Sequence, residues 1–424
     1  MATWLVARGN KQEADAMIER KEYLQRLYDW KDEQVIKVVT GIRRCGKSTL
    51  LKQYQEKLLQ SGILPEQIIS INFEDLEYEE LLDYKALYRY IKERLCEGKM
   101  TYIFLDEIQK VDSFEKAVDS IYIKDMTDIY ITGSNAYMLS GDLTTLLTGR
   151  YVEISMLPFS FRDYYALTAP ELSPDAAFAD YMRYGGFPYL STMKKTPEKA
   201  AVYLEGIYNT VIIKDIEDRQ NRRENDPSKR KITDIALLKT IARYLASVVG
   251  SPVSVKSVTD YLTSNGRKIS PNTVSDYMEA LKESFIFYKA DRIDIVGKQF
   301  LKSNSKWYVV DLGLRSHMLP RQKYDLGFSI ENIVYFELLR RGCQVNIGKS
   351  GNTEVDFVAH SQDACCYFQV TADMTSEETF SREMRPLESI RDNYEKTVLT
   401  LDRFTAGNYN GIKVINVIDW LLNP

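Results

Sequence analysis

Residues 41–49, which read GIRRCGKST, combine the residue types that bind nucleotide phosphates. Four of them, Gly41, Gly46, Lys47 and Ser48, fit the pattern G-x-x-x-x-G-K-[ST]. In this pattern the glycines let backbone N–H groups surround the phosphates, the lysine neutralises β- and γ-phosphate charge, and the hydroxyl is offered to Mg²⁺. We therefore predict a site for a nucleoside triphosphate and Mg²⁺, built from Gly41, Arg44, Cys45, Gly46, Lys47, Ser48 and Thr49.

An acidic pair, Asp106 and Glu107, follows the apolar run YIFL at 102–105. An aspartate at the end of such a strand can hold the Mg²⁺ shell together with Ser48, and the next glutamate can polarise the attacking water. An acidic pair at a strand end is also common as a solvated turn. Because a phosphate-binding segment precedes it, we favour the catalytic interpretation.

Two further polar positions are candidates for catalysis. The stretch DIYITGSNAYML delivers Ser134 and Asn135 to the end of another strand, where a polar side chain can sense the γ-phosphate or orient water; an ordinary polar turn is the alternative. Arg150 precedes a fifth strand and is either an arginine finger on a neighbouring subunit's nucleotide or a surface arginine.

The elements around these residues predict how they come together. A β-branched strand, VIKVV at 35–39, precedes the glycine-rich segment, and an amphipathic helix at 48–60 follows it. Further strands are expected at 67–73, from 102, before Ser134 and after Arg150. Strands that alternate with helices predict an α/β fold with a parallel sheet whose ligands bind at the carboxyl edge.

The length, residue composition and net charge of the chain disfavour several classes of protein. A chain of 424 residues is expected to form two or three domains. It has no apolar run of about 18 to 20 residues and no apolar segment near its start that is typical of a secretion signal, so we expect no membrane association and a cytoplasmic location. Five cysteines and two histidines disfavour disulfide frameworks and zinc sites. A net charge of −4 argues against a uniformly basic, nucleic-acid-coating surface.

The motifs together resemble a prokaryotic family of AAA-type P-loop ATPases with a C-terminal domain of unassigned function. The resemblance is carried by GIRRCGKSTLL, INFED, IFLDEIQKV, ITGSNAYML, LTGRYVEISMLPFSFRDYY, YMRYGGFPYL, KWYVVDLGLRS, IENIVYFELLRRG and EVDFVA. It implies an ATPase with the sheet order 5-1-4-3-2, followed by a winged helix and a nuclease-like fold. It implies ATP and Mg²⁺ as cofactors and little about biological role.

The middle of the chain has the element order of a winged helix. Three helical segments at 232–250, 254–266 and 270–284 precede strand-like runs at 285–294 and 306–311. Ser270 and Pro271 are typical of a helix start. The third helix offers small polar side chains for DNA contact, Asn272, Thr273 and Ser275, but it also carries Asp276 and Glu279, so a protein-docking role stays open.

The last segment has the order helix, three strands, helix, strand, which resembles the PD-(D/E)xK nuclease core. Glu337 and Asp356 match two of the acidic positions. The E-x-K motif is missing, because its place is taken by Gln369, Val370 and Thr371. Without a third carboxylate and the lysine we do not expect cleavage, and a retained scaffold for nucleic acid or a partner is favoured.

We therefore expect four segments: a P-loop ATPase core at 1–165, a helical lid and linker at 166–230, a winged helix at 231–325, and a nuclease-like α/β domain at 326–424. The predicted function is a Mg²⁺-dependent ATPase that acts as a DNA-associated motor or switch. DNA is expected to bind through 255–310 and 326–424, in a chain that can form a homo-oligomer. The alternatives are a scaffold ATPase with a protein partner and an ATP-gated nuclease.

Overall fold

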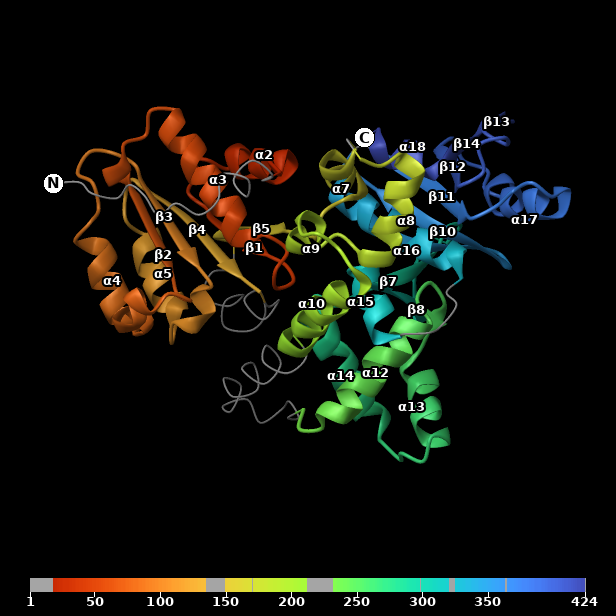
Figure 1. Ribbon diagram of the computed structural model, residues 1–424, viewed down its shortest axis with the longest axis horizontal. Coiled ribbons are helices and arrows are strands. Elements are labelled where there is room, and N and C mark those ends of the chain that lie inside the picture. Colours follow the sequence, from red (N-terminus) through yellow and green to blue (C-terminus); the bar gives the residue numbers. More distant parts are fainter. Residues whose placement is uncertain are drawn as a thin grey trace.

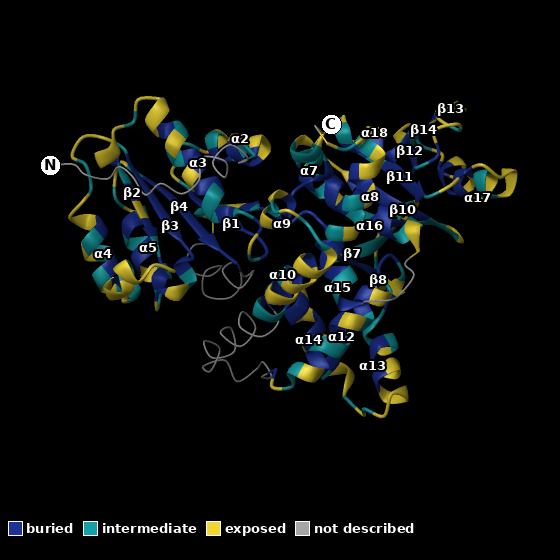
Figure 2. Cartoon of the chain, viewed as in Figure 1, coloured by how far each residue is buried: buried dark blue, intermediate teal, exposed yellow. Residues whose placement is uncertain are grey.

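The computed structural model describes residues 18–134, 149–169, 171–211, 232–297, 299–319, 325–362 and 364–423. Two β-sheets organise the molecule, one in an N-terminal domain that runs from α2 to β5 and one in a C-terminal body that runs from α7 to α18 (Figure 1). The strands of the N-terminal sheet are largely buried, whereas in the second sheet the outermost strand β13 is exposed (Figure 2). In the described part of the chain, no helix is long and apolar enough to cross a membrane.

The N-terminal sheet has five parallel strands in the order β2-β3-β4-β1-β5. This order confirms the predicted 5-1-4-3-2 arrangement, in which β4 lies between β1 and β3. The strands are β1 Ile36–Thr40, β2 Ile68–Asn72, β3 Thr101–Asp106, β4 Thr127–Gly133 and β5 Tyr151–Ser155.

Helices cover both faces of this sheet because its strands are apolar on both sides. In β3, Ile103 and Leu105 contribute to one core, with α4 and α5, while Tyr102 and Phe104 contribute to the other. On the second side Tyr54 of α3 packs against Phe104 and Tyr130. The helices are α2 Lys21–Asp29, α3 Lys47–Gln60, α4 Tyr84–Lys92 and α5 Phe114–Tyr122, with short 3-10 turns η1 Pro65–Gln67, η2 Leu76–Leu82 and η3 Ile108–Lys110.

A helical region follows the first sheet and includes the three helices predicted for a winged helix. The third of these, α14, begins as predicted: the Ser270 side chain accepts a hydrogen bond from the Thr273 N–H, and Pro271 is the first helical residue. The helices of this region are α7 Phe161–Thr168, α8 Pro174–Tyr184, α9 Pro188–Thr192, α10 Pro197–Asn209, α12 Ile235–Ser247, α13 Val255–Ser264, α14 Pro271–Glu283 and α15 Leu312–Met318.

The second sheet has nine strands in the order β13-β14-β12-β11-β10-β9-β7-β8-β6. Its strands are β6 Pro252–Val253, β7 Phe287–Asp294, β8 Gln299–Val309, β9 Gln344–Ser350, β10 Thr353–His360, β11 Cys365–Thr371, β12 Glu395–Thr400, β13 Gly407–Tyr409 and β14 Ile412–Asn416. The remaining helices are α16 Leu326–Arg340, α17 Glu377–Glu388 and α18 Val417–Leu422.

This sheet crosses the boundary that we expected between residues 325 and 326. Strand β7 pairs in parallel with β9, from Arg292 opposite Ile347 to Asp294 opposite Lys349. The two strands predicted for the winged helix, β7 and β8, are therefore part of the same sheet as the strands predicted for the nuclease-like domain. Backbone hydrogen bonds therefore join the two segments within one sheet.

Candidate nucleotide site and its links to the C-terminal body

The glycine-rich segment bends sharply between β1 and α3, and the backbone conformation of this bend requires glycine at two positions. Gly41 has a φ of 142° and Gly46 a φ of 105°, in the region that side chains rarely adopt. A Cβ atom at Gly41 would lie 2.1 Å from the carbonyl oxygen of Met156. Gly46 is the N-cap of α3, so the unpaired N–H groups of that helix face the place predicted for phosphates.

The Lys47 side chain is buried inside this bend. Its Nζ lies 3.0 Å from the carbonyl oxygen of Gly41 and 3.4 Å from that of Ile42. It is also 3.9 Å from Oε1 of Glu107. These neutral and acidic oxygens hold the ammonium group where phosphate oxygens would attract it.

The side chains of Asp106 and Ser48 meet at the carboxyl edge of the sheet. Burial raises the pKa of Asp106, while hydrogen bonds donated by the Ser48 and Thr132 hydroxyls oppose that shift. A buried carboxylate beside a hydroxyl is a suitable pair of oxygen ligands for Mg²⁺, whose charge would favour the ionised carboxylate. The donor set therefore fits the predicted metal, and Ser48 and Asp106 would hold it.

Glu107 adopts a left-handed backbone conformation, with a φ of 55°, which turns its side chain back into the site. Its N–H donates to Oγ1 of Thr132 at 2.9 Å. Its carboxylate accepts hydrogen bonds from the Ser134 hydroxyl, at 3.2 Å, and from the Gln109 amide. Sequence reasoning did not identify Thr132 or Gln109, although Thr132 is a polar residue two positions before the predicted Ser134.

The other predicted site residues lie in different surroundings. Arg44 is exposed with a φ of 69°, and Cys45 is fully buried, which raises the pKa of its thiol. Thr49 is half-buried in the first turn of α3. Asn135 lies outside the described residues.

Arg150 is not brought together with the nucleotide residues of its own chain. Its carbonyl oxygen accepts a hydrogen bond from the N–H of Ile36, at the start of β1. Because β1 and β5 are parallel, both starts lie at the sheet edge opposite the glycine-rich bend. The guanidinium group forms an ion pair with Asp119 and lies over the Tyr122 ring.

The segment Met156–Phe159, here called the connector, links the nucleotide site to the C-terminal body. On one side, the Met156 N–H donates to the carbonyl oxygen of Thr40 at 2.7 Å, and the Met156 backbone contacts Gly41. On the other side, the buried Arg340 of α16 donates to the carbonyl oxygen of Pro158 at 3.0 Å. The connector therefore contacts both the phosphate-binding bend and the second sheet's helix.

A second contact at the connector joins two of the sequence motifs, YGGFPYL and VVDLGL. The Phe159 N–H donates to the carbonyl oxygen of Gly186, and the Gly186 N–H donates to Asp311 at 2.6 Å. Gly185 has a φ of 78°, and a Cβ there would lie 2.0 Å from the Asp311 carboxylate. Burial raises the pKa of Asp311 to about 6. We call Phe159, Gly185, Gly186, Asp311 and Arg340 the joint.

A second polar cluster lies in a cavity of about 550 Å³ between β6, β10, β11, α16 and α17. Here Lys306 of β8 lies 2.9 Å from Glu331, 3.0 Å from Glu354 and 3.5 Å from Asp356. Sequence reasoning missed both Lys306 and Glu331. The helical glutamate beside Asp356 is Glu331 and not Glu337.

Glu337, which the resemblance groups with Asp356, does not line the cavity. It lies six residues after Glu331, and its carboxylate pairs with Arg341 at 3.0 Å and Arg340 at 3.7 Å. Its contacts are therefore at the joint side of the helix. The helix is buried on nearly all sides, so hydrophobic periodicity did not show which glutamate faces the cavity.

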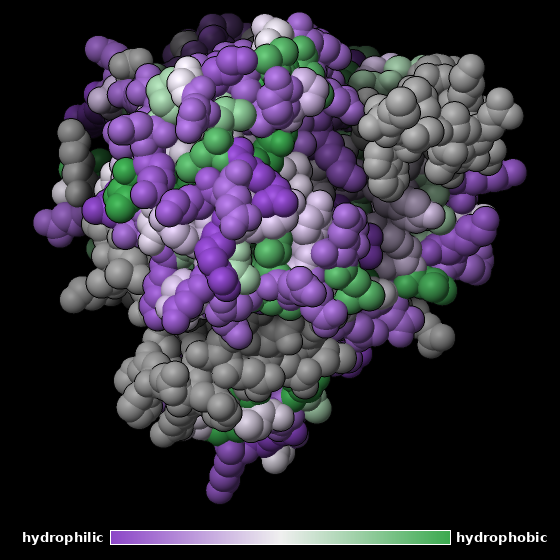
Figure 3. Space-filling view, turned by 90° about the vertical axis from the view of Figure 1, so that its left-hand side faces the viewer, coloured by the Kyte–Doolittle hydropathy of each residue, from purple (hydrophilic) through white to green (hydrophobic). Residues whose placement is uncertain are grey.

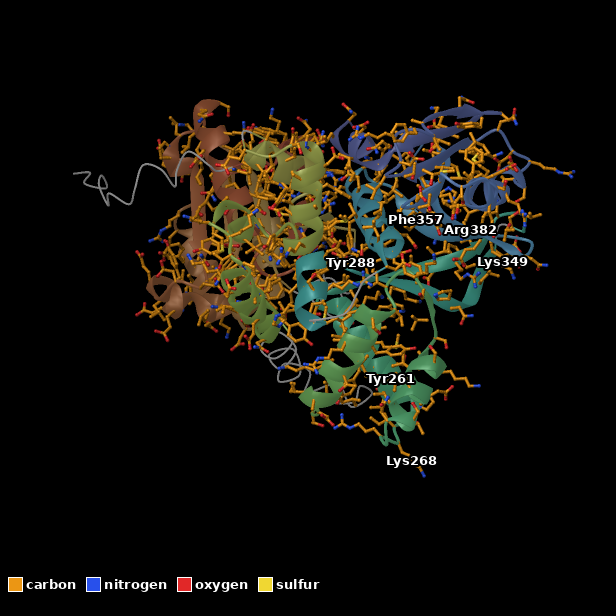
Figure 4. All side chains as sticks on the ribbon, turned by 45° about the vertical axis from the view of Figure 1, so that its right-hand side comes forward. Tyr261, Lys268, Tyr288, Lys349, Phe357 and Arg382 are labelled. Carbon is orange, nitrogen blue, oxygen red and sulfur yellow. The ribbon has the colours of Figure 1, made fainter. Side chains whose placement is uncertain are left out.

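The surface of the three-helix region is mixed in charge. The outward residues of α14 include Asn272 and Ser275, together with Asp276 and Glu279. Lys268 projects from the tip of this region, before α14 begins (Figure 4). The face of the molecule shown in Figure 3, on the side of the N-terminal domain, is mostly hydrophilic, with hydrophobic residues in small scattered groups.

Comparisons with known proteins agree with the architecture of the nucleotide site. Residues 33–165 match the AAA domain family, and residues 175–325 match a domain family of unknown function. An uncharacterized protein of Haemophilus influenzae is 39% identical over 96% of this chain and 99% of its own length. An uncharacterized protein of Methanocaldococcus jannaschii is 28% identical over 77% of this chain and 73% of its own length.

Solved structures with a similar chain course include a Walker-type ATPase of Pyrococcus abyssi. It is 18% identical, with a TM-score of 0.44, and the match covers 72% of this chain and 96% of that one. The Orc1 protein of Aeropyrum pernix, solved in complex with DNA, is 14% identical with a TM-score of 0.29, over 72% of this chain and 93% of that one.

Proposed function

We propose a Mg²⁺-dependent, ATP-driven switch for this chain, which belongs to the same family as the Haemophilus influenzae relative and carries an AAA-type P-loop ATPase domain. The observation that carries the proposal is the convergence of Lys47, Ser48, Asp106 and Glu107 at one edge of the parallel sheet. A glycine-rich bend, a buried cation, a Mg²⁺ ligand pair and a positioned carboxylate are the parts that nucleotide hydrolysis requires.

Each residue has a distinct role in this proposal. Lys47 exchanges the carbonyl oxygens of its own loop for the oxygens of the β- and γ-phosphates. Glu107, whose backbone and carboxylate are fixed by Thr132 and Ser134, orients the attacking water. Mg²⁺, when bound by Ser48 and Asp106, would neutralise charge on the phosphates.

The test compares two substitutions by nucleotide binding and ATP turnover. Lys47→Ala is expected to abolish binding or turnover, because the phosphates lose their buried cation. Glu107→Gln is expected to retain binding and lower turnover by about 100-fold or more, because the water loses its acceptor. Turnover at the parent rate in Glu107→Gln would show that another group orients the water.

The coupling of hydrolysis to the C-terminal body is supported by the connector. The bend that closes on phosphates touches Met156, and three residues later Phe159 is bound by Gly186 and lies near Arg340. Interfaces of this kind transmit small shifts because a packed segment moves as a unit. A change in backbone conformation at Gly41 would therefore reach the joint through the four residues of the connector, 156–159.

We further propose DNA as the macromolecule that the switch handles, through residues 255–310 and 326–424, with a winged helix and a nuclease-like fold in these segments. The order of three helices followed by β7 and β8 supports this. Exposed basic residues at the start of α13, at the tip of the helical region, and on and after α17 also support it: Lys256, Lys268, Arg382, Arg385 and Arg391. Asp276 and Glu279 count against α14 itself entering a groove.

ATP turnover with single-stranded, duplex and branched DNA, against no DNA, tests this second proposal. Stimulation that decreases as salt rises is expected, because basic residues release counterions from phosphates. Turnover that is indifferent to every DNA would favour the alternative, a scaffold ATPase with a protein partner. A homo-oligomer in which Arg150 reaches a neighbour's nucleotide stays a prediction, and it requires the Asp119 ion pair to open.

A further inference from the structure

The cavity around Lys306 gathers carboxylates in the segment whose sequence resembles a nuclease core. Asp356 of β10 and Glu331 of α16 face it, and Gln369 of β11 lies beside them. The cavity wall includes more acids than bases, with six carboxylates and two cations among its residues: Asp325, Glu331, Glu354, Asp356, Asp373 and Glu383 against Lys306 and Arg382. Such a cluster either binds a cation or contains one.

The carboxylate oxygens are already engaged. Asp356 accepts a hydrogen bond from the Val370 N–H at 2.9 Å, and Glu331 accepts one from the Tyr308 hydroxyl at 2.6 Å. Gln369 is neutral, and its amide donates to Glu383 at 3.0 Å. Among the described residues, no group of three or more His, Cys, Asp or Glu side chains is arranged to hold a metal ion.

Lys306 is the cation of this cluster. Its side chain is only 3% exposed, and its Nζ lies within 3.5 Å of three carboxylates. It is held in place because β8 runs beside β7 and β6 in the sheet, with Lys306 opposite both Ala290 and Pro252. A lysine so placed supplies one positive charge at the point where a divalent cation would supply two.

We propose that Lys306 takes the place of a metal ion in this cavity, as a resident ammonium group bound by Glu331, Glu354 and Asp356. In this proposal the three carboxylates serve as ligands of the chain's own lysine. The cavity therefore does not recruit Mg²⁺, and nucleic acid bound by the C-terminal body is not cleaved there.

This proposal predicts a site that appears when Lys306 is removed. In Lys306→Met three carboxylates face a vacated position, and their oxygens need to move by roughly 0.8 to 1.4 Å to reach the ligand distances of a small divalent cation. We expect the nucleotide-free variant to bind Mn²⁺ at least about tenfold more tightly than the parent, measured by electron paramagnetic resonance. The gain should disappear in Lys306→Met with Asp356→Asn.

Lys289→Met is the matched control. Lys289 is on the neighbouring strand β7 but is 36% exposed and pairs with Asp291, so its removal should leave Mn²⁺ binding as in the parent. If Lys306→Met unfolds without metal, recovery of its circular dichroism spectrum on addition of Mn²⁺ is the expected result. Folded Lys306→Met with parent-like Mn²⁺ binding would overturn the proposal.

The parent chain gives a measurement that does not depend on the folding of a variant at Lys306. Nucleotide-free parent protein should show no Mn²⁺ binding that is sensitive to Asp356→Asn. Mn²⁺ bound by the parent and lost in Asp356→Asn would show that the cavity is a metal site and that Lys306 does not replace the ion. Neither result depends on ATP turnover, so the proposed ATPase function is tested separately.

Discussion

Thr132 shows how much of the nucleotide site depends on a residue that performs no chemistry. Its hydroxyl donates to Asp106 and accepts the N–H of Glu107, so one side chain fixes both acidic residues. The strained backbone at Glu107 is retained because this contact and the bond from Ser134 determine where the carboxylate points. Positioning residues of this kind commonly affect rate more than affinity.

Thr132→Val keeps the shape of the side chain and removes both hydrogen bonds. We expect ATP turnover to fall by about 10- to 100-fold with little change in nucleotide affinity, because Asp106 and Glu107 lose their support. Thr127→Val is the control, since Thr127 begins the same strand at the opposite edge. Equal turnover in Thr132→Val and the parent would show that the acidic pair is positioned without it.

Asp356 gives the stability of the chain a pH dependence with a definite sign. Burial, followed by repulsion from Glu331, raises its pKa to about 7, from an ordinary value of 3.8. The folded chain then binds more protons than the unfolded chain between these values. The contribution of Asp356 to stability is therefore present below pH 4 and is lost as pH rises towards 7.

Urea unfolding at several pH values measures this contribution. The free energy of unfolding of the parent, relative to that of Asp356→Asn, should decrease between about pH 4 and pH 7. A difference that stays constant across this window would show that the carboxyl titrates normally in the folded chain.

At the scale of elements, the joint depends on the close approach of a backbone to a buried carboxylate. Gly185, which follows α8, lies directly against the carboxylate of Asp311, the N-cap of α15. Asp311 cannot move aside easily because it is buried and accepts backbone hydrogen bonds from Gly186 and Leu314. Helices α8 and α15 are thus held together at their ends.

Gly185→Ala should lower the free energy of unfolding by about 2 kcal/mol or more, because it combines a positive φ with a clash. Gly206→Ala is the matched control: Gly206 lies inside α10, and a Cβ there meets nothing within 4 Å. That control should stabilise the chain by about 0.5–1 kcal/mol. Similar effects of the two substitutions in thermal or urea unfolding would contradict the proposed role of the joint.

At the scale of the whole molecule, sequence patterns predict a feature correctly where a local motif adopts one backbone geometry. The glycine-rich bend, the acidic pair at the end of β3 and the start of α14 were all predicted, because each depends on neighbours within about one turn or strand. The strand order also agrees with the order implied by the resemblance.

The features that sequence patterns did not predict depend on contacts between segments that are distant in the chain. No local pattern indicates that Lys37, in an apolar strand, is fully buried 2.6 Å from Asp128. Lys306 and Glu331 come from different elements, and the all-round burial of α16 hides which of its glutamates faces the cavity. The pairing of β7 with β9 is likewise a long-range contact, and it places strands of two expected domains in one sheet.

The central claim is that the nucleotide state at the bend is transmitted through the connector to the C-terminal body. Hydrogen exchange measured by mass spectrometry on Glu107→Gln, with and without Mg²⁺ and ATP, tests it most directly. We predict altered exchange in residues 41–49 and also in 156–159, 185–190 and 311–315. Altered exchange confined to residues 41–49 would contradict the claim.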